Sequence, residues 1–204
     1  TLVGDGMRQT KGLAARFFNS LAQARVNNVA IAKGSSERSI STVIESKRAK
    51  KAVKVIHQNF FSDRHTIDVF LVGCGNVGTE LLGQIEKQQP ALLKRNVQLR
   101  VYGIANSRKL LLNSQGIDLS GDWKAALESA SEGLSVERLH QFANDNSLVN
   151  PVIVDCTSHE AIAEQYVDMM ESGFHVVTPN KKANTSAMSY YRKLRKTAQS
   201  TNRQ

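Results

Sequence analysis

Cysteine, tryptophan and long apolar runs are scarce in this chain of 204 residues. The two cysteines, Cys74 and Cys156, each follow a predicted strand, and their spacing does not suggest zinc. A reduced, cytoplasmic protein without a metal site is the simplest account, and a disulfide between the two is the alternative. No apolar run approaches the roughly 20 residues of a membrane span, and no secretory signal opens the chain. We therefore expect neither a membrane span nor a secreted, disulfide-stabilised domain.

Acidic residues are outnumbered, because 18 Asp and Glu stand against 27 Lys and Arg, for a formal charge of +9. Such a balance is found in proteins that bind nucleic acid. Here the basic residues are spread along the chain, and aromatic residues make up only 6%. We therefore expect solvated helix faces and a site for an anionic ligand, with no nucleic-acid surface. An apolar content of 41% is ordinary for a globular core.

A glycine-rich turn between a predicted strand and a predicted helix organises the chain. The strand begins near Ile67, and the helix is predicted to end at about Gln89, before Pro90. In a G-x-G-x-x-G turn the first glycine permits the tight bend, the second leaves room for a pyrophosphate, and the third lets the helix pack on the strand. The helix N-terminus then offers free N–H groups to the phosphates. We predict that the following residues bind a dinucleotide, the alternative being a purely structural turn: Gly73, Gly75, Asn76, Val77 and Gly78.

The second predicted strand, residues 97–105, ends where such a fold contacts the adenosine ribose. Ala105, Asn106, Arg108 and Lys109 stand there, with two cations and no acid. A carboxylate would repel a 2′-phosphate, whereas a guanidinium can bind it with two parallel hydrogen bonds. We predict NADP as the preferred coenzyme, with NAD as the other candidate. The alternative is that Arg108 only opens a solvated loop.

Two more apolar strands are predicted at residues 151–156 and 174–178. Ligands bind at the carboxyl ends of strands in open α/β sheets, so the residues that follow are candidates for the nicotinamide side. After the first strand these are Cys156, Thr157 and Ser158. Thr157 could equally cap a helix that runs to about Ser172, in a capping box with Glu160.

Residues 1–60 read as a small unit with the order (β)αββα. Helices are expected at residues 11–25 and 47–59, and strands at 29–32 and 40–44, with a turn at 34–38. The second helix is expected to bury Ala49, Val53, Ile56 and Phe60. The stretches VGDGMR and VAIAKGSSERSIS resemble the last ACT unit of aspartate kinases. That resemblance implies an amino-acid effector near Asn27 and Asn28, although the two asparagines could simply end a helix.

The stretches VFLVGCGNVG, PVIVDCTS and GFHVVTPNKKANT together resemble the homoserine dehydrogenase family, and the ACT-like segment before them points to its bifunctional aspartokinase form. The resemblance implies hydride transfer between NAD(P)H and the pair aspartate semialdehyde and homoserine. It implies that Lys181 is the active-site lysine, with Lys182 the weaker candidate, and that Asn180 and Lys181 contact the coenzyme. It also implies a fragment, since no kinase or substrate-binding domain is recognised.

The expected fold is α/β, a Rossmann-type doubly wound parallel sheet preceded by an ACT-like βαββα unit. The expected domains are residues 1–62, a linker at 63–67, and a coenzyme domain at 68–204. We expect the 204 residues to bind dinucleotide without turning over homoserine, and to form a homo-oligomer. The competing hypothesis is a regulatory and dimerisation module whose ACT unit pairs with another copy across strand edges.

Overall fold

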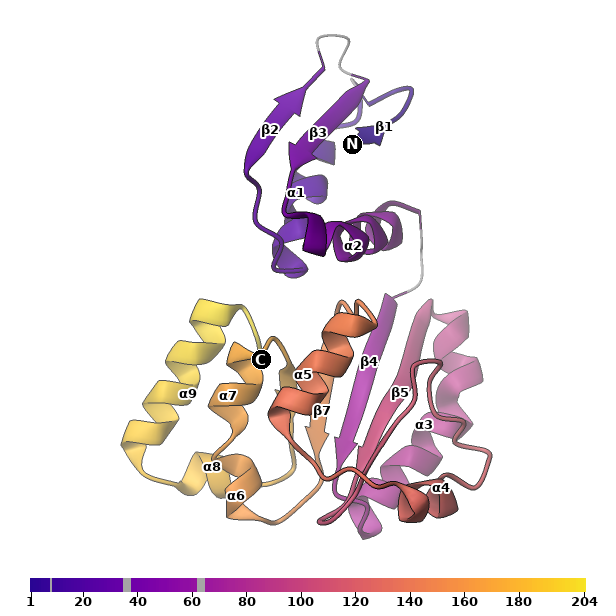
Figure 1. Ribbon diagram of the computed structural model, residues 1–204, viewed down its shortest axis with the longest axis vertical. Helices are drawn as coiled ribbons and strands as arrows, with labels where there is room; N and C mark the ends of the chain where they lie inside the picture. Colours follow the sequence, from indigo (N-terminus) through magenta and orange to yellow (C-terminus); the bar gives the residue numbers. More distant parts are fainter. Residues whose placement is uncertain (8, 35–37, 62–64) are drawn as a thin grey trace. The chain divides into compact units, whose positions relative to one another are not determined.

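The computed structural model describes residues 1–7, 9–34, 38–61 and 65–204, in two compact units, Thr1–Asp63 and Arg64–Gln204 (Figure 1). The expected linker, residues 63–67, is corrected in its second half, because a strand already begins at His65. The backbones of His65 and Thr66 pair with those of Val97 and Gln98, so these polar residues belong to the sheet. Residues 62–64 lie outside the described part of the chain.

The first unit has the predicted order of elements and a three-stranded antiparallel sheet with the order β1-β3-β2. The predicted turn at 34–38 lies largely outside the described residues. The elements are β1 (Leu2–Val3), α1 (Leu13–Gln23), β2 (Ala30–Lys33), β3 (Ser39–Val43), the 3₁₀ helix η1 (Ser46–Arg48) and α2 (Ala49–Phe61).

The buried face of α2 differs from the predicted one. Ala52 and Val55 are buried, whereas Val53 is 67% exposed. The same face carries Asn59, whose Nδ2 donates to Oγ of Ser20 on α1 at 2.9 Å. The buried face thus includes a polar residue, Asn59. A prediction from apolar residues alone places the face one residue too far along the helix, at Val53, Ile56 and Phe60.

The second unit is a five-stranded sheet with the order β6-β5-β4-β7-β8, in which β4, β5, β7 and β8 are parallel and β6 is antiparallel to β5. Its first half comprises β4 (His65–Val72), α3 (Asn76–Lys94), β5 (Val97–Ala105), β6 (Leu110–Leu112), α4 (Trp123–Ser129) and α5 (Val136–Asp145). Its second half comprises β7 (Pro151–Asp155), α6 (Glu160–Ala163), α7 (Tyr166–Glu171), β8 (His175–Val177), α8 (Lys182–Thr185) and α9 (Met188–Thr201). The short edge strand β6 was not predicted.

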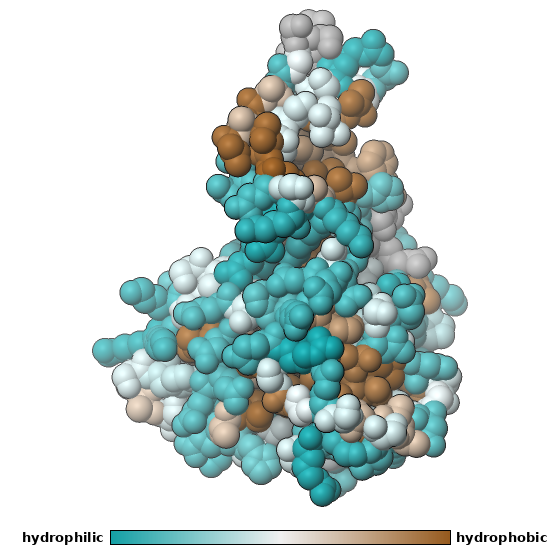
Figure 2. Space-filling view, viewed as in Figure 1, coloured by the Kyte–Doolittle hydropathy of each residue, from teal (hydrophilic) through white to brown (hydrophobic). Residues whose placement is uncertain are grey.

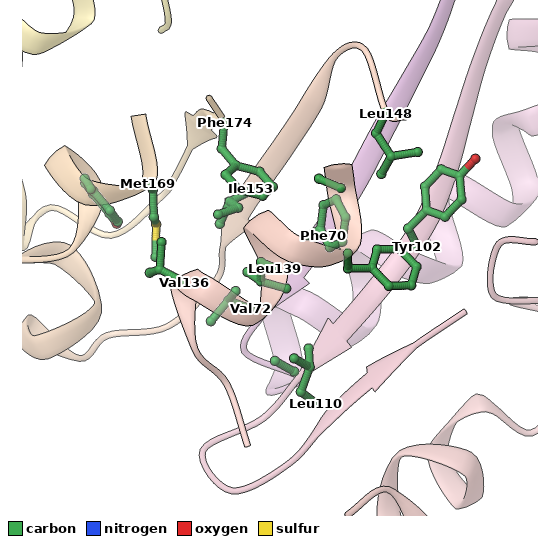
Figure 3. Packing of buried hydrophobic residues seen from close by; sticks show 14 of the residues in the cluster. Phe70, Val72, Tyr102, Leu110, Val136, Leu139, Leu148, Ile153, Met169 and Phe174 are labelled. Atoms are coloured by element: carbon green, nitrogen blue, oxygen red, sulfur yellow. The ribbon is translucent and has the colours of Figure 1, made fainter. Parts of the chain in front are cut away.

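The sheet is covered on both faces, and β4 shows why. Phe70 and Val72 belong to one buried cluster, together with residues of α5 and α7 (Figure 3). Val69 and Leu71 belong to the other, with residues of α3. Successive side chains of a strand point to opposite faces, so a strand that is apolar throughout fits a sheet with helices on each side. The expected doubly wound α/β fold is confirmed.

Two predicted helix boundaries are wrong. Helix α3 does not stop at Gln89 but continues through Pro90 to Lys94. Pro90 is exposed, so water can satisfy the carbonyl that loses its helical partner. The single helix expected up to Ser172 is instead two, α6 and α7.

The surface of the first unit carries exposed apolar side chains. Val29, Ile31 and Val43 are 68%, 58% and 58% exposed. Figure 2 shows hydrophobic residues on this unit, and a further hydrophobic area within the otherwise hydrophilic face of the second. Among the described residues, no helix is both long enough and apolar enough to cross a membrane.

Candidate functional site

The turn between β4 and α3 has the geometry that its glycines require. Gly73 has a φ of 97°, and a Cβ there would lie 2.7 Å from Cγ2 of Thr157. A Cβ on Gly78 would lie only 1.9 Å from the carbonyl oxygen of Gly73. Neither position accepts a side chain, because a real Cβ essentially never approaches a heavy atom this closely. These two glycines bring the strand, the helix and the next strand end into contact.

Gly75 differs from its neighbours, because a Cβ added there would meet no atom within 4 Å. It is the N-cap of α3, and within the described residues no side chain caps this helix N-terminus. The first N–H groups of a helix have no partner inside the helix, and the helix dipole adds partial positive charge there. Bare backbone, open space and unfilled donors are what a pyrophosphate needs.

A cavity of about 760 Å³ opens beside this turn, at the point where the strand order reverses between β4 and β7. Ligands of doubly wound sheets bind at such a reversal. The walls come from the glycine turn, the loops after β5 and β7, the loop before α5, and α6. The glycine turn and the loops after β5 and β7 contribute Val72, Gly73, Cys74, Gly75, Asn106, Ser107, Arg108, Cys156, Thr157, Ser158 and His159.

Asn106 organises the loop after β5. Its Oδ1 accepts hydrogen bonds from the backbone nitrogens of Arg108 at 2.8 Å and Lys109 at 2.7 Å. Arg108 is exposed and lines the cavity, whereas the Nζ of Lys109 donates to the carbonyl oxygen of Glu128 on α4. Of the two predicted cations, only Arg108 therefore reaches the cavity. Ala105 is buried, and its carbonyl accepts from the nitrogen of Gly73 at 2.8 Å.

Two thiols form part of the cavity wall, Cys74 after β4 and Cys156 after β7, and both are free. Burial, and secondly the proximity of Cys156, raises the pKa of Cys74 to about 11. Burial, and secondly Asp155, raises the pKa of Cys156 above its ordinary value. Both thiols are therefore protonated near neutral pH, and they form a neutral wall rather than a pair of nucleophiles.

The predicted capping box at Thr157 does not form. The Oγ1 of Thr157 accepts from the backbone nitrogen of His159 at 3.3 Å, and α6 begins only at Glu160, with His159 as its N-cap. The hydroxyl of Thr157 thus bonds to the backbone two residues further along the chain. A local bond of this kind takes the place of a helix cap. Thr157 and Ser158 lie at the cavity wall, and their assignment to the nicotinamide side stays a prediction.

The loop after β8 is where the structure departs most from the predicted site. Lys181 is exposed, occupies the N-cap position of α8, and is not among the lining residues of the cavity. Asn180 is only 6% exposed, and its side chain bonds to Asp155, to His159 and to the backbone of Lys182. Asn180 therefore joins two loops of the protein instead of facing the cavity.

Sequence reasoning missed Asp155, Tyr166 and Thr178, which form a hydrogen-bond network together with Asn180. Asp155 is fully buried at the end of β7. The sequence did indicate that Asp155 has hydrogen-bond donors nearby, because an acidic residue buried at the end of an otherwise apolar strand needs them. Which donors it would find could not be known, since Tyr166 and Asn180 lie 11 and 25 residues away.

A glycine turn at the reversal of a parallel sheet, with an uncapped helix N-terminus beside a cavity, defines a dinucleotide-binding domain of the Rossmann class. The family model described as "Homoserine dehydrogenase, NAD binding domain" matches residues 73–204, and one described as "ACT domain" matches residues 1–60. The chain belongs to the homoserine dehydrogenase NAD-binding family, with an ACT domain before it. Its coenzyme class is therefore a nicotinamide dinucleotide.

Relatives with the same two parts are bifunctional aspartokinase/homoserine dehydrogenases. The chain is 51% identical to that of Haemophilus influenzae over 201 residues, which is 98% of this chain and 24% of the relative. It is 40% identical to enzyme 2 of Arabidopsis thaliana, a chloroplastic protein, over 95% of this chain and 21% of the relative. The chain thus spans about a quarter of the length of the curated relatives that it matches.

Solved structures with a similar fold include homoserine dehydrogenases. The enzyme from Thermoplasma acidophilum has a TM-score of 0.52 at 23% identity, over 68% of this chain and 42% of that one. A hyperthermophilic archaeal homoserine dehydrogenase in complex with NADPH has the same scores and coverage. At this identity the likeness shows the fold.

Proposed function

We propose that residues 68–204 are the coenzyme-binding part of a homoserine dehydrogenase, within a longer aspartokinase/homoserine dehydrogenase polypeptide whose ACT unit is residues 1–62. The observation that carries the proposal is the bare backbone at Gly75, beside an uncapped helix N-terminus and a cavity of about 760 Å³. The match to the family model supports it. A bound nicotinamide coenzyme would supply or accept the hydride that interconverts aspartate semialdehyde and homoserine. The isolated 204 residues are expected to bind the coenzyme without turnover.

NADP is the proposed coenzyme in preference to NAD. Support comes from Arg108, which lines the cavity on the loop where the adenosine ribose is expected. The turn that Asn106 closes places the guanidinium on this loop, and no Asp or Glu is among the residues that line the described cavity. A 2′-phosphate would therefore meet a cation and no opposing carboxylate.

Lys181 is the proposed catalytic residue. It lies on the loop after β8, next to the loop after β7 whose residues line the cavity. A cationic amine near the reacting carbonyl could donate a hydrogen bond to the oxygen as negative charge develops there. Because Lys181 does not line the cavity as the structure stands, this role requires the loop to bring its amine toward the nicotinamide end when substrate binds.

The ACT unit is proposed to bind an amino-acid effector near Asn27 and Asn28, and to pair with a second copy. Support for pairing comes from Val29, just before β2, and Ile31, within β2, whose apolar side chains are 68% and 58% exposed. Exposed apolar surface is common at interfaces. We propose a cytoplasmic homo-oligomer, with no role for nucleic acid or membrane.

The test is a fluorescence titration of NADPH with this chain and with Gly75→Val. A valine at Gly75 would occupy the space for the pyrophosphate, so binding should fall at least a hundredfold. Gly83→Val is the matched control, because Gly83 also has nothing within 4 Å of its Cβ position and lies further along α3. Saturable binding that Gly75→Val leaves unchanged would refute the proposal.

The second candidate is a regulatory and dimerisation fragment whose coenzyme fold is only a scaffold. The exposed apolar sheet of the first unit is the observation in its favour. It predicts a concentration-dependent dimer and no NADPH binding. Sedimentation should show the same concentration-dependent dimer for the wild-type chain and for Gly75→Val. The NADPH titration separates the two hypotheses, because only the scaffold hypothesis expects both proteins to be equally inert toward NADPH.

A further inference from the structure

A buried hydrogen-bond network joins the carboxyl ends of β7 and β8, and Asp155 lies at its centre. Oδ1 of Asp155 accepts from the backbone nitrogen of Thr157 at 2.7 Å. Oδ2 accepts from Oη of Tyr166 at 2.5 Å and from Nδ2 of Asn180 at 3.2 Å. Every one of these partners is a donor, so the fully buried carboxyl group acts as an acceptor at each contact.

Thr178 adds a second set of bonds in the same place. Its Oγ1 donates to the carbonyl oxygen of Asp155 at 2.9 Å, accepts from the backbone nitrogen of Asn180 at 2.8 Å, and lies 3.0 Å from Oη of Tyr166. The hydroxyl thus joins the end of β8 to the end of β7. Two loops that are more than 20 residues apart in sequence are thereby held together by side chains.

Asn180 extends the network into both loops. Its Nδ2 donates to the carbonyl oxygen of His159 at 3.1 Å, and its Oδ1 accepts from the backbone nitrogen of Lys182 at 3.1 Å. One loop carries Thr157 and Ser158 at the cavity wall. The other loop carries Lys181, which lies between Asn180 and its partner Lys182.

Stability alone does not explain a network of this kind. Burying polar groups is costly, and well-packed apolar residues are often equally stabilising. A fully connected network does fix one arrangement of the groups that it holds. Burial, and secondly the hydrogen bond to Asp155, raises the pKa of Tyr166, so the phenol remains protonated and keeps donating.

We propose that Asp155 and Tyr166 are positioning residues that set the nicotinamide side of the site, acting through Thr157 and Asn180 and touching no coenzyme themselves. Neither lines the cavity beside the glycine turn. The adenosine side is built separately, from the glycine turn and the loop at Asn106 and Arg108. Weakening the network should therefore affect the nicotinamide half of a bound coenzyme and leave the adenosine half unchanged. This inference rests on the proposed function.

The test compares two ligands, NADPH and 2′-phospho-ADP-ribose, which is the same molecule without its nicotinamide. Tyr166→Phe removes one hydroxyl and keeps the ring. We expect about tenfold weaker binding of NADPH, because the variant must order the nicotinamide side when the coenzyme binds, and unchanged binding of 2′-phospho-ADP-ribose. Calorimetry measures both affinities on the same protein.

Tyr190→Phe is the matched control. Its Oη donates to the carbonyl oxygen of Ala163 at 2.5 Å and to none of the side chains of the network, so this variant also removes a single tyrosine hydroxyl in this unit. Both affinities should be unchanged. Thr178→Val should repeat the effect of Tyr166→Phe, and Thr178→Ser, which keeps the hydroxyl, should restore the wild-type affinities. This second pair tests the proposal even where Tyr166→Phe folds poorly.

Three results would overturn the inference. One is an equal loss of affinity for both ligands in Tyr166→Phe, which indicates general destabilisation. The second is an unchanged affinity for both ligands in that variant. The third is the same loss in Tyr190→Phe as in Tyr166→Phe. Failure of the proposed function is distinguishable, because the wild-type chain would then bind neither ligand.

Discussion

Arg108→Ala should separate NADPH from NADH. Arg108 is the only one of the two neighbouring cations that lines the cavity, because the amine of Lys109 is bonded to the carbonyl of Glu128. A charge-assisted bidentate contact contributes roughly 1.5–3 kcal/mol, and the exposure of Arg108 places it at the lower end because water screens the pair. We therefore expect a loss of about 1.5 kcal/mol, which is slightly more than a tenfold loss of NADPH affinity.

The assay is a fluorescence titration of each reduced coenzyme at low and at moderate salt. NADH lacks the 2′-phosphate, so its affinity should be the same for the wild type and Arg108→Ala. The preference for NADPH should also shrink in salt, since a contact between exposed charges is screened. Lys109→Ala is the matched control, and it should leave both affinities near their wild-type values.

The reasoning would be refuted by a preference for NADPH that survives Arg108→Ala, or by one that disappears in Lys109→Ala. The first result would place the 2′-phosphate elsewhere. The second would mean that Lys109 exchanges its bond with Glu128 for one to the coenzyme.

Two further predictions concern stability. Gly78→Ala should destabilise the chain by about 3 kcal/mol or more in urea unfolding, because its Cβ would lie 1.9 Å from the backbone oxygen of Gly73; a loss below about 1 kcal/mol would contradict the close packing of this turn. Burial, and secondly Arg203, lowers the pKa of His175. The unfolded chain therefore binds a proton more readily than the folded one, and the free energy of unfolding should fall as the pH drops below about 6.5 and then level off below the lowered pKa. His175→Gln should remove this part of the pH dependence, and an unchanged pH profile in the variant would count against it.

The parts of the fold that could be predicted from sequence depend on neighbouring residues. The glycine turn is one example, because strand, glycines and helix follow each other without interruption between His65 and Lys94. The close packing of this turn requires glycine at Gly73 and Gly78, because a Cβ at either position would clash with neighbouring atoms. The apolar strands of the parallel sheet are another, since burial on both faces leaves an unbroken apolar run.

The parts that failed depend on contacts that are distant in sequence or on exposure. Pro90 does not end α3, because it lies on the solvent side of the helix. Thr157 bonds within a turn and caps no helix. Asn180 was expected to contact the coenzyme, and only the fold reveals that Asp155 and His159 occupy its side chain.

The predicted basic residues of the site show the same limit. Arg108 and Lys109 are adjacent in sequence and alike in charge, yet only the fold distinguishes the one at the cavity from the one bonded to α4. Lys181 was identified from a resemblance, and the sequence could not show that it is not among the residues that line the cavity.

Amide chemical-shift mapping with NADPH tests the central claim most directly, because it locates the phosphates on the backbone. We predict that the largest shifts at saturation fall on the amides of Gly75, Asn76 and Val77, with a second group at Thr157 and Ser158. Shifts confined to the other large cavity, between β8 and α9, or the absence of saturable shifts, would contradict the account.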